Sequence, residues 1–130
     1  MLMNSIQAVR AIQYAAALAS RSAALSAPFS IVVTTVASDA KAREIAKAAL
    51  VARLAACVQL YRAQSLYVWK GELREDAEIA LHLKIRSEDF EPLSALVIRL
   101  HDYETPEILR FDIAEGDAAY LDWVKAAVQK

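Results

Sequence analysis

Strict alternation of apolar and polar residues marks the segment Glu78-Ile-Ala-Leu-His-Leu-Lys-Ile-Arg86. Every second residue from Ile79 to Ile85 is large and aliphatic, which predicts a strand with one dry face and one polar face. A stretch rich in Val, Leu and Tyr, residues 58–69, precedes it across the turn Lys70-Gly71. Together the two stretches predict a long β-hairpin.

The predicted hairpin is longer than the small core that two helices can cover. An unpaired strand edge that protrudes from a core invites pairing with another chain. We therefore expect the protruding part of the hairpin to contact another subunit.

One strand and one helix are predicted before the hairpin. A β-branched run at residues 31–36 is typical of a buried strand. Ser38 and Asp39 then offer an N-cap, and apolar residues recur at helical spacing over residues 39–55.

A second helix and a last strand are predicted after the hairpin. An apolar stripe indicates a helix over residues 90–100, with Ser87 or Asp89 as its cap. Alternation predicts a strand near residues 109–113, and a C-terminal helix follows Gly116-Asp117. The order βαββαβ, with a long central hairpin and an extra C-terminal helix, is that of an α+β ferredoxin-like sandwich.

Composition excludes several classes of function. The 130 residues suffice for one domain and a tail, and 57% of them are apolar. Fifteen basic against 16 acidic residues argue against non-specific nucleic-acid binding and against a polybasic membrane role. The single cysteine, Cys57, makes a cysteine-rich zinc site impossible. We expect a soluble domain, because no apolar run approaches the ~20 residues needed to span a bilayer.

Residues 1–28 differ in composition from the domain expected at residues 29–130. They contain Arg10 and Arg21 but no acid, and the first acidic residue is Asp39. Arginine and serine without acids are typical of an organellar transit peptide. A loose N-terminal helix and an upstream start codon are the alternatives. We therefore expect a cytoplasmic protein, or an organellar one if this segment is a targeting signal.

The loop His101-Asp-Tyr-Glu-Thr-Pro-Glu107 concentrates groups that can do chemistry. Imidazole, phenol and carboxylate are used by metal, acid–base and charged-ligand sites. Glu104 and Glu107 could share a ligand with His101. Equally, His101 could be a helix-capping histidine, and Glu107 could bind backbone amides of the turn.

The sequence gives little support for a preformed metal site or for catalysis. Cys57 would need imidazole partners, and the chain has only His82 and His101. The spacings HxH, HExxH and CxxC are absent from the sequence. With no nucleophile–base pair and no cofactor fingerprint, we predict that the protein is not an enzyme and has no obligatory cofactor.

Two aromatic pairs are candidates for an interface or a ligand site. Tyr67 and Trp69 precede the hairpin turn, and Tyr120 and Trp123 fall on the C-terminal helix. We favour the interface, because aromatic residues dominate interface cores.

Five separate features stand out along about residues 30–128. They are Leu54-Ala-Ala-Cys-Val58, Ser65-Leu-Tyr-Val-Trp-Lys-Gly-Glu72, Lys84, His101-Asp-Tyr-Glu-Thr-Pro-Glu-Ile108 and Tyr120-Leu-Asp-Trp123. In this order the features resemble the CutA family of divalent-cation tolerance proteins. The resemblance implies a ferredoxin-like subunit, a homotrimer built through the long strands, a likeness to PII signalling proteins, and a role in tolerance to divalent metals, especially copper.

Three positions depart from the family pattern. Asp102 replaces the usual proline of the loop, and Leu100 and Thr35 stand where some members carry a histidine and a cysteine. Two functions remain open. The first is a trimer that binds Cu(II) or another divalent ion weakly through His101, Glu104 and Cys57. The second is a PII-like trimer that holds a small ligand or partner protein in inter-subunit clefts lined by Tyr67, Trp69, Lys84, Tyr103, Glu107 and Trp123.

Overall fold

The computed structural model describes residues 5–13 and 27–130 of the chain. Residues 5–13 form a short helix. The N-terminal extension predicted for residues 1–28 thus lies partly outside the described residues. Within the described ranges, no helix is long and apolar enough to cross a membrane.

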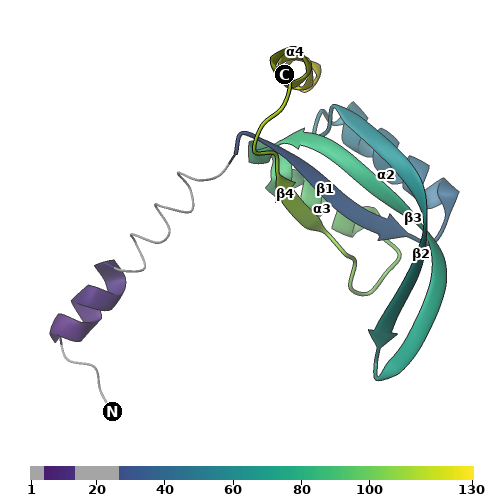
Figure 1. Ribbon diagram of the computed structural model, residues 1–130, viewed down its shortest axis with the longest axis horizontal. Coiled ribbons are helices and arrows are strands. Elements are labelled where there is room, and N and C mark those ends of the chain that lie inside the picture. Colours follow the sequence, from purple (N-terminus) through teal and green to yellow (C-terminus); the bar gives the residue numbers. More distant parts are fainter. Residues whose placement is uncertain (1–4, 14–26) are drawn as a thin grey trace.

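Four antiparallel strands form one sheet (Figure 1). The order across the sheet is β2-β3-β1-β4, so the first strand lies between the third and the last. This order and the succession of elements confirm the ferredoxin-like βαββαβ arrangement. The strands are β1 (Phe29–Val36), β2 (Cys57–Trp69), β3 (Glu72–Arg86) and β4 (Leu109–Asp112).

Two helices cover one face of the sheet, and a third lies at one end of it (Figure 1). The covering helices are α2 and α3, and α4 is the predicted C-terminal helix. A single 3-10 turn, η1, leads from β3 into α3. The bounds are α2 (Asp39–Val51), η1 (Ser87–Asp89), α3 (Phe90–Leu100) and α4 (Ala118–Ala127).

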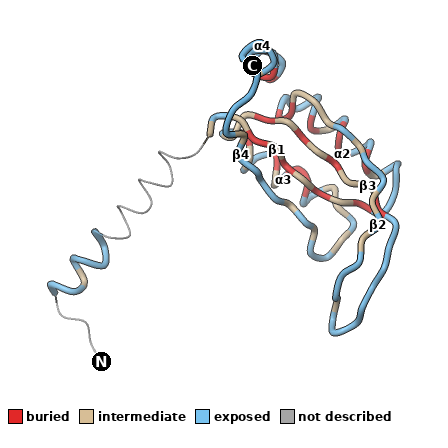
Figure 2. Tube along the Cα trace, viewed as in Figure 1, coloured by how far each residue is buried: buried red, intermediate tan, exposed pale blue. Residues whose placement is uncertain are grey.

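The core lies between the sheet and the pair α2 and α3 (Figure 2). Alternate residues of β1 and β3 point into it, as the period of two predicted. Their most buried members, Val32, Leu81, Leu83 and Ile85, are fully inaccessible to solvent. The other face of the sheet carries the alternate set of residues, and none of the helices within residues 27–130 packs over its centre (Figure 1).

The helix predicted for residues 39–55 ends earlier than expected, at Val51. Ser38 caps its start as predicted, because its side chain accepts a hydrogen bond from Lys41 N–H. At the other end Arg53 has a φ of 56°, a left-handed conformation that cannot continue the helix. Leu54 is still buried, but it reaches the core from a turn rather than from the helix.

The cap predicted for the second helix is confirmed in position, because Asp89 is the N-cap residue of α3, but its side chain makes no capping hydrogen bond. Neither Ser87 nor Asp89 caps α3 through its side chain. The Asp89 carboxylate instead accepts a 2.9 Å hydrogen bond from Arg86 Nε, and Ser87 Oγ lies 2.6 Å from Ser30 Oγ. Asp89 thus pairs with a residue three positions before it, and Ser87 with a residue of β1.

The hairpin turn has the geometry that its sequence requires. Lys70 and Gly71 have φ values of 51° and 79°. Positive φ at both central residues defines a type I′ turn, whose twist matches that of the flanking strands. A 13-residue β2 is therefore paired along its whole length with β3, from Cys57 opposite Lys84 to Trp69 opposite Glu72.

Candidate functional site

The loop from His101 to Glu107 is anchored to β1 by its histidine. His101 ends α3, and its Nε2 lies 2.9 Å from the carbonyl oxygen of Thr35. The backbone N–H of Tyr103 donates to Nδ1 at 3.1 Å. A nitrogen that accepts a hydrogen bond carries no proton, so the imidazole is the neutral Nε2–H tautomer and donates to Thr35. Both ring nitrogens are occupied by structural hydrogen bonds.

Tyr103 anchors the same loop to β3. Its hydroxyl donates a 2.7 Å hydrogen bond to Glu78 Oε2, and the Glu78 residue is only 8% exposed. Burial, followed by this hydrogen bond, raises the pKa of the Tyr103 phenol well above its ordinary value. The rings of Tyr103 and His101 also lie against each other, with centroids 4.8 Å apart.

Two carboxylates of the loop form ion pairs with other elements. Asp102 lies 3.5 Å from Lys41 of α2, and Glu104 lies 3.7 Å from Lys70 of the hairpin turn. Both carboxylates are exposed, so water screens each pair and its contribution to stability is small. Asp102 thus links the loop to α2. Glu107 is exposed.

The three predicted metal ligands do not form one site within a chain. Cys57 lies opposite Lys84 of β3, whereas Thr35, which holds His101, lies opposite Ala80. These two positions of β3 are four residues apart, or about 13 Å along the strand. Among residues 5–13 and 27–130, no group of three or more His, Cys, Asp or Glu side chains is placed to hold a metal ion. One chain therefore does not bring Cys57 together with His101 and Glu104, and a metal site that uses these three residues stays a prediction.

Near the hairpin tip, two of the predicted ligand-site aromatics lie on the same face of β2. The Tyr67 hydroxyl donates to the carboxylate of Asp76, and this hydrogen bond raises the pKa of Tyr67. Trp69 has the ammonium of Lys70 at 5.6 Å from its ring centroid. Both aromatics thus have charged partners within the same hairpin.

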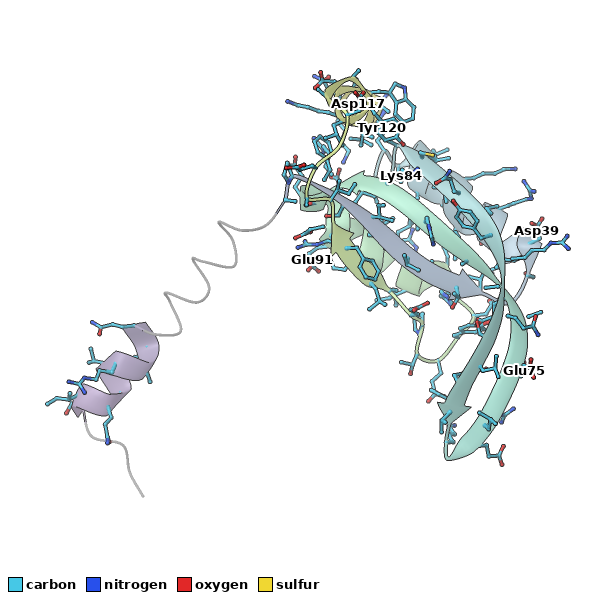
Figure 3. All side chains as sticks on the ribbon, in the orientation of Figure 1. Asp39, Glu75, Lys84, Glu91, Asp117 and Tyr120 are labelled. Atoms are coloured by element: carbon cyan, nitrogen blue, oxygen red, sulfur yellow. The ribbon has the colours of Figure 1, made fainter. Side chains whose placement is uncertain are left out.

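At the other end of β3, Lys84 lies near Tyr120 of α4 (Figure 3). Trp123 of the same helix lies against Tyr120 and completes a second group. Lys84 Nζ donates to Gln59 Oε1 at 2.7 Å and lies 5.7 Å from the Tyr120 ring centroid. The rings of Tyr120 and Trp123 have centroids 5.7 Å apart. Lys84 lies twelve residues along β3 from Glu72, the partner of Trp69, which corresponds to about 40 Å. A pocket that uses both groups would need residues of more than one subunit.

Sequence reasoning did not find Glu78 and Gln59 as partners of candidate residues. Glu78 does start the alternating strand on its polar side, but its burial depends on a tyrosine 25 residues away. Gln59 faces Lys84 only through the register of β2 and β3. No local pattern encodes either contact.

The face of the sheet away from α2 and α3 carries large exposed apolar side chains of β2 and β4 beside the polar residues of β3. Leu109 and Phe111 of β4 pair with Val33 and Ile31 of β1, so these four side chains lie on one face. Phe111 is 55% exposed although it is a large aromatic residue. Tyr61 of β2 lies on the same face, with its ring 4.7 Å from that of His82. We call this surface the open face: Phe29, Ile31, Val33, Thr35, Cys57, Gln59, Tyr61, Ala80, His82, Lys84, Leu109 and Phe111.

The fold, the long hairpin and the anchored loop define a ferredoxin-like protein of the CutA type. The family model of the CutA1 divalent ion tolerance protein matches residues 30–127, and the chain belongs to this family. A divalent-cation tolerance protein CutA of Thermus thermophilus is 45% identical over 96 residues, which are 73% of this chain and 93% of the relative. A CutA homolog of Danio rerio is 34% identical and aligns over 76% of this chain and 67% of its own length.

Solved structures agree with this assignment. The periplasmic divalent cation tolerance protein CutA from Archaeoglobus fulgidus matches with a TM-score of 0.76 and 34% identity, over 78% of this chain and 99% of that one. The divalent cation tolerance protein Cut A1 from Thermus thermophilus matches with a TM-score of 0.72 and 44% identity, over 74% and 94% of the two chains. The predicted family is confirmed.

Proposed function

We propose that this protein functions in the tolerance of divalent cations as a homotrimer. Membership of the CutA family supports the role in tolerance. The number of three subunits comes from the resemblance to that family. The observation that carries the proposal of assembly is the open face of the sheet.

The open face has the properties of an interface rather than of a solvated surface. Large apolar side chains that cluster on one exposed surface mark protein–protein contacts. Phe111, Leu109 and Tyr61 are all exposed on this face, and the half-buried side chains of β1 lie between them. Aromatic residues of this kind are enriched at interfaces.

The hairpin tip supports the same proposal. Val68 and Leu73 are paired across the strands and share one side of the tip with Leu66. All three are exposed, because α2 and α3 do not extend to this part of the hairpin (Figure 2). A second subunit packed against the tip would remove these apolar side chains from water.

Direct binding of copper or another divalent ion is, in our proposal, weak. A single chain does not fit a preformed metal site, since the predicted ligands are dispersed and both nitrogens of His101 are hydrogen-bonded. An ion could bind this imidazole only if Thr35 or Tyr103 released it. The cost of that release weakens the binding of any divalent ion to His101.

Light scattering on the purified full chain tests the assembly. We expect a mass about three times that of the 14.3 kDa subunit. A monomer over the micromolar concentration range would contradict the proposal, because the open face would then be a stable solvent-exposed surface.

A further inference from the structure

The helix at residues 5–13 exposes an apolar side. Ile6, Val9 and Ile12 recur every third residue, so they lie on one side of the helix. They are 66%, 52% and 69% exposed, which is high for aliphatic side chains. The described residues thus leave this side of the helix exposed to solvent.

Positive charge accompanies this apolar side. Arg10 borders the same shallow hollow as Ile6 and Val9. The first 38 residues contain two arginines and no carboxylate, whereas residues 39–130 contain 13 basic and 16 acidic residues. The helix therefore lies in a stretch of sequence without negative charge, whereas residues 39–130 carry a net negative charge.

The helix is not part of the domain shared by the family. The family model begins at residue 30. The chain is hydrogen-bonded to the folded domain at Pro28, whose carbonyl accepts a 2.8 Å hydrogen bond from Ser87 N–H. Whatever the helix binds is thus a property added to the CutA domain of this chain.

We propose that the helix over residues 5–13 binds the surface of an anionic membrane. Its apolar side enters the boundary between headgroups and acyl chains, and Arg10 contacts lipid phosphates. An anionic lipid surface is the partner that matches both the apolar side and the absence of carboxylates. The near-neutral net charge of the whole chain argues against membrane binding through a polybasic surface. Insertion of an apolar helix side does not require such a surface.

Sedimentation of the full chain with lipid vesicles tests the proposal. Vesicles of equal parts phosphatidylcholine and phosphatidylglycerol should carry the protein into the pellet, and pure phosphatidylcholine should carry less. Ile12→Ser should weaken binding about tenfold, because a buried aliphatic side chain is lost. Ala11→Ser is the matched control on the opposite side of the helix and should bind like the unchanged protein.

Arg10→Gln separates the electrostatic contribution from the apolar one. We expect about fivefold weaker binding to the anionic vesicles and no change on pure phosphatidylcholine. The proposal is overturned if sedimentation does not depend on vesicles, or if Ile12→Ser binds as well as Ala11→Ser. All three substitutions change exposed side chains of this helix, so none of them should alter the fold of the domain.

Discussion

The two faces of the sheet differ in whether elements of the same chain cover them. The covered face is closed by α2 and α3, and its residues Leu81, Leu83 and Ile85 are fully buried within one chain. The open face carries Phe111 and Tyr61, which one chain leaves exposed. The covered face therefore explains the stability of the subunit, and the open face explains why the subunit should assemble.

The largest expected effect is on the covered face. Leu83→Ala should lower the free energy of unfolding by about 2 to 5 kcal/mol, because it leaves a cavity in the core. Val51→Ala, at an exposed position, should change it by less than about 0.5 kcal/mol. Denaturant unfolding at two protein concentrations checks the comparison. A loss for Leu83→Ala that disappears at high concentration would mean that assembly, not the core, holds this face.

A smaller effect is expected where the loop is anchored to the hairpin. Tyr103→Phe removes the hydrogen bond to Glu78 and leaves a nearly buried carboxylate without this donor. The free energy of unfolding should fall by about 1 to 3 kcal/mol. Stability of the substituted protein equal to that of the unchanged protein would show that the loop is held by its other contacts.

The same pair gives a pH dependence of known sign. The folded state raises the pKa of Tyr103, so its stabilising contribution is complete below the ordinary tyrosine pKa of about 10. The contribution is lost as the pH rises above that value. Unfolding curves should therefore show a fall in stability above about pH 10 that is smaller in Tyr103→Phe. A fall of equal size in both proteins would assign it to other groups.

The weakest effect concerns metal binding at the loop. Calorimetric titration with Cu(II) should give weak binding that drops in His101→Ala and persists in His82→Ala, the substitution of the chain's other histidine. Tight binding, or binding that is unchanged in His101→Ala, would contradict the description of His101 as an occupied loop anchor with low affinity for metal.

The sequence predicted the long strands and their turn better than it predicted where elements end and which distant residues are in contact. Alternation in β3 and the Lys70-Gly71 turn were sufficient for the hairpin, because local periodicity and turn geometry determine both. The end of α2 was missed, since the left-handed conformation of Arg53 has no glycine to signal it.

The candidate site was predicted only in part. The loop at residues 101–107 was recognised from its composition, but the partner of His101 is a backbone carbonyl 66 residues away. Cys57 and His101 were grouped by chemical type, whereas strand register places them at different positions along the sheet. Contacts set by register and tertiary packing have no local signature.

A paired substitution tests the central claim that the open face is an assembly surface. Phe111 on the open face and Ile98 on the outer side of α3 are similarly exposed, at 55% and 58%. Phe111→Arg should reduce the mass measured by light scattering from a trimer to a monomer, since a charge cannot be buried unpaired in an interface. Ile98→Arg should leave the trimer intact. Equal masses for the two proteins would contradict the account.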